Sequence, residues 1–156
     1  MDYISFIRSK VGHDKIILTF AAGILTNDDG KVLLQLRGDK KTWGIIGGFM
    51  ELGENSVDTL IREFTEETGI SIRPTRLLNV YTNFEDSYPS GDIAQPIGIV
   101  YEVEAQEPYD ISNFTNEETL ALGFFSQKEI AELNLASPQH QVILDEYFAQ
   151  EFRMGL

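Results

Sequence analysis

Residues 47–70, "GGFMELGENSVDTLIREFTEETGI", decide the fold, because a glycine-rich acidic loop runs directly into a helix with two distinct faces. Asn55 or Ser56 can accept backbone hydrogen bonds at the start of that helix, as an N-cap does. Gly69 can end the helix in the left-handed conformation, which glycine adopts without steric cost. The pattern therefore predicts a helix over residues 56–69. Asp58 falls in its first turn, where the helix dipole favours an acidic side chain.

The two faces of this helix differ in chemistry. Side chains at helical spacing along one face are mostly apolar, which predicts that this face packs on the core. The face consists of Val57, Leu60, Ile61, Phe64 and Thr68. Glu63, Glu66 and Glu67 gather within about 100° on the other face, and Arg62 lies one turn from Glu66, close enough to pair with it.

The acidic face has two interpretations. A run of like charge on a helix is usually a solvated surface, and like charges one turn apart cost only about 0.2–0.5 kcal/mol per pair. The loop before the helix favours a metal site instead. Its glycines let the backbone approach a ligand closely, and Glu51 and Glu54 add two more carboxylates. Hard divalent cations take several oxygen ligands, so the loop and helix together predict a cation site.

Towards the N-terminus, two segments rich in Ile and Leu flank the turn sequence "NDDG" at residues 27–30. These segments are "KIILTFAAGILTN", residues 15–27, and "KVLLQLR", residues 31–37. Branched apolar residues on either side of a turn signal predict a β-hairpin. Residues 2–10, "DYISFIRSK", are consistent with a short helix, because Ile4 and Ile7 fall on nearby faces.

Towards the C-terminus, strands outnumber helices. The pattern predicts strands over residues 76–85, 96–105 and 119–126, with the turn-rich "DSYPSGDIAQ" between the first two. Ser126 can cap a short helix over 127–133, and Ser137 followed by Pro138 opens a final helix that runs to residue 152. This order of elements predicts one domain built on a mixed sheet with helices packed on its faces.

The composition excludes several classes of function. The chain has 156 residues, 25 acidic and 12 basic, for a formal charge of −13. That charge repels a nucleic-acid polymer, whereas a small phosphate ligand carried by a divalent metal is compatible with it. Without cysteine there is no thiolate metal site, cysteine nucleophile or disulfide. No signal peptide or membrane-spanning stretch is evident, which predicts a cytoplasmic protein without a membrane partner.

The spacing of the fixed residues resembles the signature of the Nudix hydrolases, the MutT-like pyrophosphohydrolases. Gly48 is followed after five residues by Glu54, and after seven more by "REFTEETGI" from Arg62 to Ile70. The segments "VLLQLR", "WGIIGG" and "EETLALGFFSQKEI" extend the resemblance over most of residues 15–150. Ile46, where many relatives carry proline, and Phe64, where an aliphatic residue is commoner, depart from the pattern without removing a reactive group.

The resemblance implies a Nudix-type α/β/α sandwich and a division of the chain into a helical extension over 1–14, a single domain over 15–150 and a tail over 151–156. It also implies hydrolysis of a diphosphate bond in a nucleoside diphosphate linked to another moiety, such as a nucleoside triphosphate, a nucleotide sugar or ADP-ribose. The cofactor would be Mg²⁺ or Mn²⁺, which neutralises phosphate charge and lowers the pKa of water. The alternative is a non-catalytic Nudix-fold module that binds or senses a nucleotide.

The resemblance also implies roles for individual residues. Glu66 and Glu67 would be metal ligands, and Glu63 would be a ligand or the general base. Arg62 would orient these glutamates, and Glu54 would support the metal cluster or pair with Arg62. A carbonyl oxygen of Gly47 or Gly48 could add a further ligand.

Contacts with the substrate are less determined. Some relatives take their general base from a later loop, where Glu117 and Glu118 lie. Arg37 could clamp a phosphate, while Tyr81, Phe84 and Tyr88 could stack a nucleobase or belong to the core. His140, within the final helix, is interpreted as a surface or packing residue. Homodimers are common among relatives, so a homodimer is a further expectation.

Overall fold

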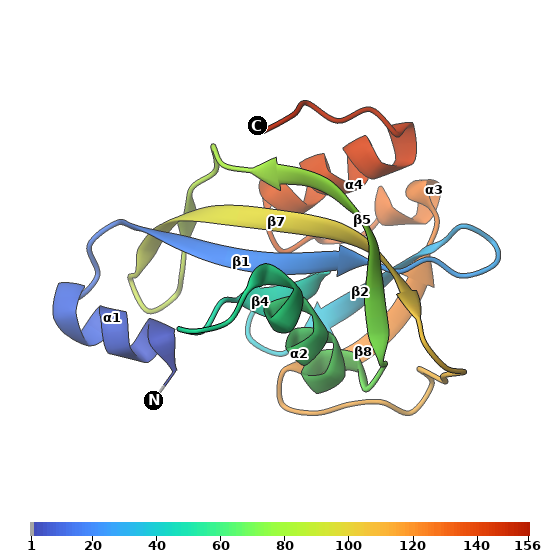
Figure 1. Ribbon diagram of the computed structural model, residues 1–156, viewed down its shortest axis with the longest axis horizontal. Coiled ribbons are helices and arrows are strands. Elements are labelled where there is room, and N and C mark those ends of the chain that lie inside the picture. The colour runs from blue at the N-terminus through green and yellow to red at the C-terminus, as the bar shows by residue number, and fades with distance from the viewer. Residues whose placement is uncertain (1) are drawn as a thin grey trace.

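The computed structural model describes residues 2–156, which form a mixed α/β fold with helices on both sides of the strands (Figure 1). Met1, the first residue of the extension predicted over 1–14, lies outside the described residues. The helices are α1 (Tyr3–Val11), α2 (Ser56–Thr68), α3 (Gln127–Ile130) and α4 (Pro138–Ala149). The strands are β1 (Ile16–Ile24), β2 (Val32–Arg37), β3 (Trp43–Gly44), β4 (Ile46–Phe49), β5 (Ile72–Tyr81), β6 (Asp86–Ser87), β7 (Ile93–Ala105) and β8 (Thr119–Phe125).

The larger sheet has five strands in the order β4-β1-β7-β5, with the short β6 pairing on β7. The long strands β1 and β7 run parallel through the middle of the molecule, and the other pairs are antiparallel (Figure 1). On β1 the four successive residues 21–24 are buried, whereas buried and half-buried residues alternate along most of β7. The predicted strands over 76–85 and 96–105 are confirmed in kind, and both begin earlier, at Ile72 and Ile93.

A second sheet holds three antiparallel strands in the order β3-β2-β8. The hairpin predicted from residues 15–37 is therefore wrong in its pairing. The turn forms, with Gly30 donating its N–H to the carbonyl of Asn27 at 3.0 Å, and Leu33 still bonds Leu25 at 2.9 Å. Beyond that point β1 and β2 separate into different sheets, because each finds longer partners elsewhere in the chain.

Helix α2 begins and ends where the sequence predicts. Asn55 and Asp58 form a reciprocal capping box, in which each side chain accepts the backbone N–H of the other residue. Gly69 takes the left-handed conformation, with φ of 72°, and its N–H bonds the carbonyl of Thr65. Leu60 and Phe64 are fully buried and anchor one face of the helix in the core. Because one face is anchored, the direction in which the glutamates of the other face point is fixed as well.

The hydrophobic core has two parts that meet around β1 and β2. One part packs α2 against the strands through Leu33, Ile46, Leu60 and Phe64, and the other packs α4 against them through Leu34, Ile143 and Leu144. Neighbouring residues of β2 thus serve opposite faces, as the two-residue period of a strand requires. The mixed sheet architecture with helices on both faces, predicted from the sequence, is confirmed.

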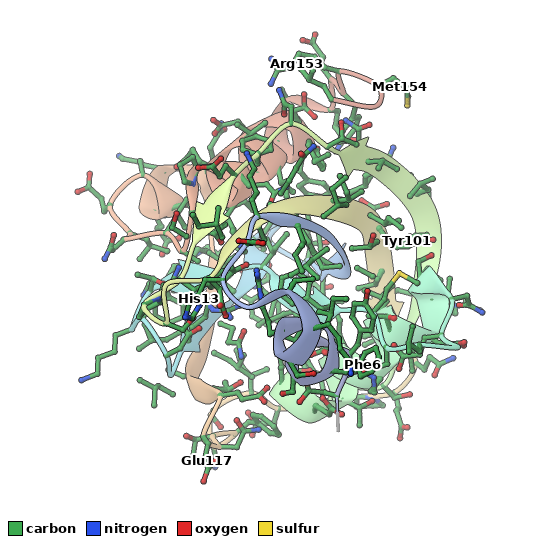
Figure 2. All side chains as sticks on the ribbon, turned by 90° about the vertical axis from the view of Figure 1, so that its left-hand side faces the viewer. Phe6, His13, Tyr101, Glu117, Arg153 and Met154 are labelled. Carbon is green, nitrogen blue, oxygen red and sulfur yellow. The ribbon has the colours of Figure 1, made fainter. Side chains whose placement is uncertain are left out.

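The C-terminal segment folds back onto β5 after α4 ends. The final helix stops at Ala149, because Gln150 adopts a left-handed conformation with φ of 54°, so the predicted extension to residue 152 is wrong. Glu146 is buried and accepts hydrogen bonds from Tyr81 and from the Arg153 backbone, which anchors the tail. Arg153 and Met154 lie at one end of the molecule and Glu117 at the other (Figure 2). In the described part of the chain, the helices lack the length and apolarity that spanning a bilayer requires.

Candidate metal centre and pocket

Three glutamates converge on one point beside α2. Oxygen atoms of Glu63, Glu67 and Glu118 all lie within 4.8 Å of one another. Glu63 and Glu67 come from successive turns of α2 and are 8% and 5% exposed, whereas Glu118 approaches from the start of β8 and is exposed. Gly48 on β4 makes room for this group, because an added Cβ would lie 2.3 Å from the Glu63 carboxyl carbon.

Side chains just before β8 fix the position of Glu118. Asn116 donates its side-chain amide to the carbonyl of Glu66 at 2.9 Å, and the Thr119 hydroxyl donates to the carbonyl of Glu67 at 2.8 Å. Both acceptors are carbonyls of the last turn of α2, which have no partner within the helix. The residues on either side of Glu118 therefore cap α2, and Glu118 is held beside the glutamates that α2 carries.

Arg62 links a carboxylate of the glycine-rich loop before α2 to a carboxylate on α2 itself. Its Nε and Nη2 donate to the two carboxylate oxygens of Glu54 at 2.6 and 3.0 Å, and its Nη1 donates to Glu63 Oε1 at 2.7 Å. Nη2 also donates to the carbonyl of Phe49 at 3.2 Å. Hydrogen bonds from Arg62 hold the pKa of Glu54 at about 2. Glu54 is thus placed as the partner of Arg62, outside the group formed by Glu63, Glu67 and Glu118.

The glutamate group brings three carboxylates together, and Arg62 pairs directly with one of them, Glu63. Burial raises the pKa of Glu63, and burial together with the neighbouring Glu63 raises the pKa of Glu67 to about 9. The Oε2 atom of Glu67 is buried and has no hydrogen-bond partner among the described residues. An ionised carboxylate in that setting requires a counter-charge. The carboxylate oxygens match the ligands that Mg²⁺ and Mn²⁺ prefer, so the residues fit a divalent cation.

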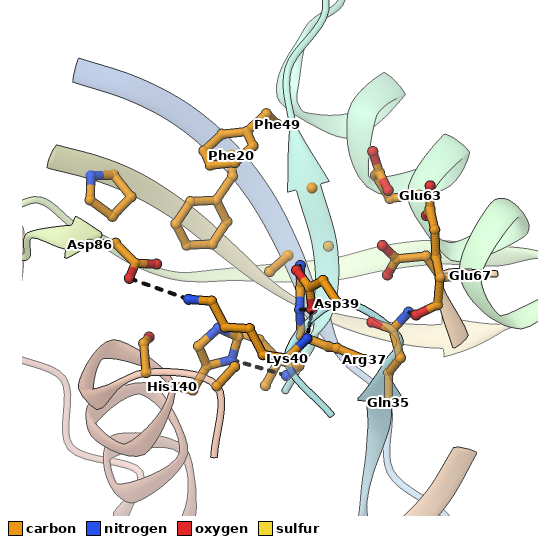
Figure 3. Close-up of a pocket in the computed structure, with 18 of the residues that line it drawn as sticks. Phe20, Gln35, Arg37, Asp39, Lys40, Phe49, Glu63, Glu67, Asp86 and His140 are labelled. Atoms are coloured by element: carbon orange, nitrogen blue, oxygen red, sulfur yellow. Dashed lines mark hydrogen bonds and ion pairs between the residues drawn. The ribbon is translucent and has the colours of Figure 1, made fainter. Parts of the chain in front are cut away.

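The glutamates form one wall of a cavity of about 620 Å³ (Figure 3). Much of the remaining lining comes from β1, β2, β4, the loop after β2, the loop around β6 and the start of α4. Besides the glutamates, the lining includes Phe20, Arg37, Lys40, Phe49, Asp86, Tyr88, Pro96, Gln139 and His140. An acidic end and a mixed basic and aromatic end therefore share one cavity.

Two of the predicted substrate contacts line this cavity. Arg37 leaves the end of β2, where its guanidinium donates from Nε and Nη2 to the carboxylate of Asp39, both at 3.3 Å. Tyr88 is half-buried, and the Lys40 ammonium lies 5.1 Å from its ring centroid in a cation–π contact. Burial raises the pKa of Tyr88 to about 12. Gly47 and Gly48 also line the cavity, while their function as carbonyl ligands stays a prediction.

Other predicted residues lie apart from the cavity or the glutamate group. Tyr81 is 1% exposed and donates its hydroxyl to Glu146 at 2.8 Å, so its predicted contact with substrate is corrected to a place in the core. Phe84 packs on the same core. The Glu66 side chain is 51% exposed and contacts Arg62 at 3.4 Å, outside the group of three carboxylates. Glu117 lines the cavity but projects at the edge of the molecule (Figure 2).

Several cavity residues gave no signal in the sequence. Phe20 is part of an apolar strand, and its ring packs edge-on against Phe49 at a centroid distance of 6.2 Å. Gln139 and His140 open α4, far along the chain from the acidic motif. The interpretation of His140 as a surface or packing residue is incomplete, because its ring is half-buried and lines the cavity. In the sequence, the only sign of this position is that His140 is a polar residue in the first turn of a predicted helix.

Comparison with known proteins adds a family assignment. A NUDIX domain model matches residues 18–147. A "MutT-like protein" of Streptomyces ambofaciens is 32% identical over 111 residues, covering 71% of this chain and 65% of the relative. An "ADP-ribose pyrophosphatase" of Methanocaldococcus jannaschii is 33% identical over 81 residues, covering 51% of this chain and 46% of the relative. The aligned region thus spans less than two thirds of either curated relative.

Solved structures share the fold. A "NUDIX hydrolase from Nitrosomonas europaea" has a TM-score of 0.70 at 23% identity, over 89% of this chain and 93% of the other. The "Crystal structure of UDP-X diphosphatase" has a TM-score of 0.69 at 18% identity, over 98% of this chain and 73% of the other. The family model covers the glutamate group, most of the cavity lining and all but the first two residues of the strands. The chain therefore belongs to the Nudix hydrolase family.

Proposed function

We propose that this protein hydrolyses a diphosphate bond in a nucleoside diphosphate linked to another moiety, with Mg²⁺ or Mn²⁺ as cofactor. The observation that carries the proposal is the meeting of Glu63, Glu67 and Glu118 within 4.8 Å on the wall of a cavity of about 620 Å³. The buried Oε2 of Glu67, which has no hydrogen-bond partner among residues 2–156, supports a cation at that point. A cavity of this size holds a molecule such as a nucleoside diphosphate derivative.

Each residue of the glutamate group has a distinct task in this proposal. Glu63, Glu67 and Glu118 would hold the cation. Bound there, the cation would neutralise the diphosphate and lower the pKa of the attacking water. Arg62 orients Glu63 through the bond at 2.7 Å, and Glu54 fixes Arg62 in turn. In this arrangement Glu66, which contacts Arg62 at 3.4 Å, supports the arginine from the solvent side.

The basic end of the cavity would bind a part of the substrate other than the diphosphate. Arg37 and Lys40 come from the end of β2 and the loop that follows it. Lys40 also lies 3.8 Å from Asp86, so each cation already has one acidic neighbour and carries little excess charge. This end is therefore suited to a partly charged or polar group, while the glutamate end takes the diphosphate through its cation.

The names of relatives support the chemical class. Matches include proteins named as ADP-ribose pyrophosphatase and RNA pyrophosphohydrolase, the latter 36% identical over 55 residues. A solved Nudix domain of Shewanella oneidensis NrtR, bound to ADP-ribose, shares the fold with a TM-score of 0.63. The net charge of −13 argues against a nucleic-acid polymer as substrate. A cytoplasmic location, a homodimer and the division at residues 15 and 150 remain proposals of the same kind.

The test is a hydrolysis screen with matched variants. Purified protein is incubated with Mg²⁺ and a panel of nucleoside triphosphates, nucleotide sugars, ADP-ribose and dinucleoside polyphosphates, and the phosphate-containing products are separated. We expect turnover of at least one compound and a loss of 100-fold or more, on the order of a lost catalytic group, in Glu67→Gln. Glu66→Gln, also on α2 but outside the group of three carboxylates, is the control and should lose far less.

The outcomes separate the enzyme from the alternative. If the wild type turns over no compound but one of them binds in a calorimetric titration, the chain is a nucleotide-binding module of the Nudix fold. If Glu63→Gln and Glu67→Gln both retain full activity, the assignment of the metal centre is wrong although the family is unchanged. Equal losses in Glu66→Gln and Glu67→Gln would show that the exposed glutamate belongs to the centre.

A further inference from the structure

The His140 side chain at the start of α4 is fixed in one tautomer by the backbone of the β3–β4 segment. Its Nδ1 accepts the backbone N–H of Ile45 at 3.1 Å. The ring lies against Gly44, where an added Cβ would be 3.0 Å from His140 Cε1. Because a backbone N–H can only donate, Nδ1 carries no proton, and the imidazole is neutral with its proton on Nε2.

The neutral state is reinforced by the surroundings of the ring. Burial, with the nearby charges of Arg37 and Lys40, lowers the pKa of His140 to about 3. The Nε2 atom has no hydrogen-bond partner among the described residues. The surrounding protein atoms also do not enclose it completely. It therefore retains access to the cavity that the ring lines (Figure 3). His140 thus offers the cavity one uncharged hydrogen-bond donor.

Gln139, the preceding residue, offers an acceptor to the same cavity. Its side chain is 4% exposed, and its Nε2 donates to the carbonyl of Pro96 on β7 at 3.3 Å. That bond fixes the amide so that Oε1 has no partner among residues 2–156 and is not enclosed by them. Gln139 lines the same cavity. Because its nitrogen is hydrogen-bonded to the protein, this buried amide is fixed in direction, and its oxygen can accept a hydrogen bond from a ligand.

An aromatic platform lines the cavity as well. The Phe20 ring lies on the backbone of β7, since an added Cβ at Gly98 would be 2.5 Å from Phe20 Cζ. Phe49 meets it edge-on at an interplanar angle of 83°. These two contacts fix the orientation of the ring, which lines the cavity with the side that β7 does not cover. A flat, fixed aromatic ring is suited to stacking a base.

From these contacts we infer that His140 and Gln139 read the hydrogen-bonding edge of a nucleobase stacked on Phe20. The inference rests on the proposed function, whose substrate it specifies as base-bearing. Every nucleobase presents an acceptor next to an N–H donor, which complements His140 Nε2–H and Gln139 Oε1. A phosphate offers only acceptors and would oppose Gln139 Oε1. A sugar hydroxyl can donate and accept but has no flat face for Phe20.

The test measures binding without hydrolysis. AMP, GMP, CMP, UMP and ribose 5-phosphate, which has the sugar and phosphate but no base, are each titrated calorimetrically into wild-type protein with Mg²⁺. We expect at least one nucleoside monophosphate to bind tenfold or more tightly than ribose 5-phosphate, about the contribution of one stacked base. If ribose 5-phosphate binds as tightly as the tightest nucleotide, or if no nucleotide binds at millimolar concentration, the inference is wrong.

A matched pair of variants separates the two nitrogen atoms of His140. His140→Asn keeps an acceptor for the Ile45 N–H and removes the donor that faces the cavity. His140→Gln keeps a donor near Nε2 and removes the acceptor. We expect His140→Asn to lose about three- to tenfold in affinity for the preferred nucleotide, with ribose 5-phosphate unchanged, and His140→Gln to retain most of the affinity. A general loss of folding would weaken both ligands, which thermal melts of the two variants would also show.

Failure of this inference differs from failure of the proposed function. If diphosphates are hydrolysed but base-bearing and base-free ligands bind alike in every variant, only the role of His140 and Gln139 is lost. If His140→Asn selectively weakens the binding of nucleotides while no diphosphate is hydrolysed, His140 still recognises the base and the chain is a binding module.

Discussion

Arg62 and Glu54 form a two-point ion pair, with bonds of 2.6 and 3.0 Å, and the remaining terminal nitrogen of Arg62 reaches Glu63 at 2.7 Å. One planar guanidinium thereby fixes Glu63, a glutamate of the candidate metal centre, relative to the glycine-rich loop that carries Glu54. Lysine cannot reproduce this geometry, because its ammonium is a single point charge. We predict that Arg62→Lys lowers kcat at least tenfold and changes KM less than threefold, measured by steady-state kinetics at saturating Mg²⁺.

The control for this prediction is Arg73→Lys, because Arg73 pairs with Glu104 at an exposed position that does not line the cavity. Exposed ion pairs contribute little, so this variant should keep wild-type kinetics. A rise in KM with unchanged kcat in Arg62→Lys would show that Arg62 binds substrate rather than positioning Glu63.

Gly47 and Gly48 are adjacent but should respond differently to alanine. A Cβ at Gly48 would lie 2.3 Å from the carboxyl group of Glu63, whereas a Cβ at Gly47 would lie 2.4 Å from the carbonyl oxygen of Ala21 in β1. The flexible end of the Glu63 side chain can move aside for an added methyl group, whereas the backbone of the paired strand β1 cannot. We predict that Gly48→Ala stays folded and loses Mg²⁺ binding, while Gly47→Ala is destabilised by about 1–3 kcal/mol. Thermal melts with and without Mg²⁺ measure both effects, and a Gly48→Ala protein with a wild-type Mg²⁺ response would refute the first.

Glu67 should destabilise the metal-free protein at alkaline pH. Its pKa is about 9 in the folded protein against 4.5 for the free side chain, because it is buried beside Glu63. The folded state therefore holds a proton that the unfolded chain releases, so the free energy of unfolding falls as the pH rises from 4.5 towards 9. We predict that Glu67→Gln melts on the order of 5 °C higher than wild type at pH 8 in EDTA.

The same variant should show two further effects. The difference in melting temperature should shrink towards pH 5, because the unfolded chain, in which the carboxyl group has its free pKa of 4.5, then also retains part of its protons. Addition of Mg²⁺ should raise the melting temperature of the wild type and leave that of Glu67→Gln nearly unchanged, since mass action requires the binding site. An equal Mg²⁺ response in both proteins would place the cation elsewhere.

His140 should make the protein sensitive to acid. Its pKa is lowered to about 3 by burial and by two neighbouring cations, against 6.5 for the free side chain. The unfolded chain therefore binds a proton below pH 6.5 that the folded protein excludes, and stability is lost as the pH falls from 6.5 towards 3. We predict that urea denaturation shows a pH dependence steeper in wild type than in His140→Asn by about 1 kcal/mol per pH unit below 6. Parallel pH profiles would mean that His140 is already solvated.

The sequence predicted α2 well because its signals are local. Asn55, Asp58 and Gly69 lie next to the ends that they define, and Leu60 and Phe64 fix the buried face through the helical period alone. The same local signals predicted the turn at Gly30. They could not predict that β1 leaves β2 for β7, because that choice depends on pairing between segments about 80 residues apart.

The cavity was harder to predict than the helix beside it. Tyr81 and Tyr88 flank one loop, and nothing in their order shows that Tyr81 turns inward to Glu146 while Tyr88 lines the cavity. His140 resembles any polar residue at the start of a helix until Gly44 and Ile45 are placed against its ring. Residues of this kind acquire their chemistry from tertiary contacts, which the spacing of residues in one chain does not encode.

The caps that Asn116 and Thr119 place on the last turn of α2 have a consequence for the order of folding. Glu118 joins Glu63 and Glu67 when the segment at the start of β8 docks on α2, a contact between residues about 50 apart in the sequence. Contacts of such long range form late, because closing a large loop costs entropy before it is rewarded. A nascent or partly folded chain therefore lacks the complete carboxylate set, and a cation held by all three glutamates would report that folding has finished.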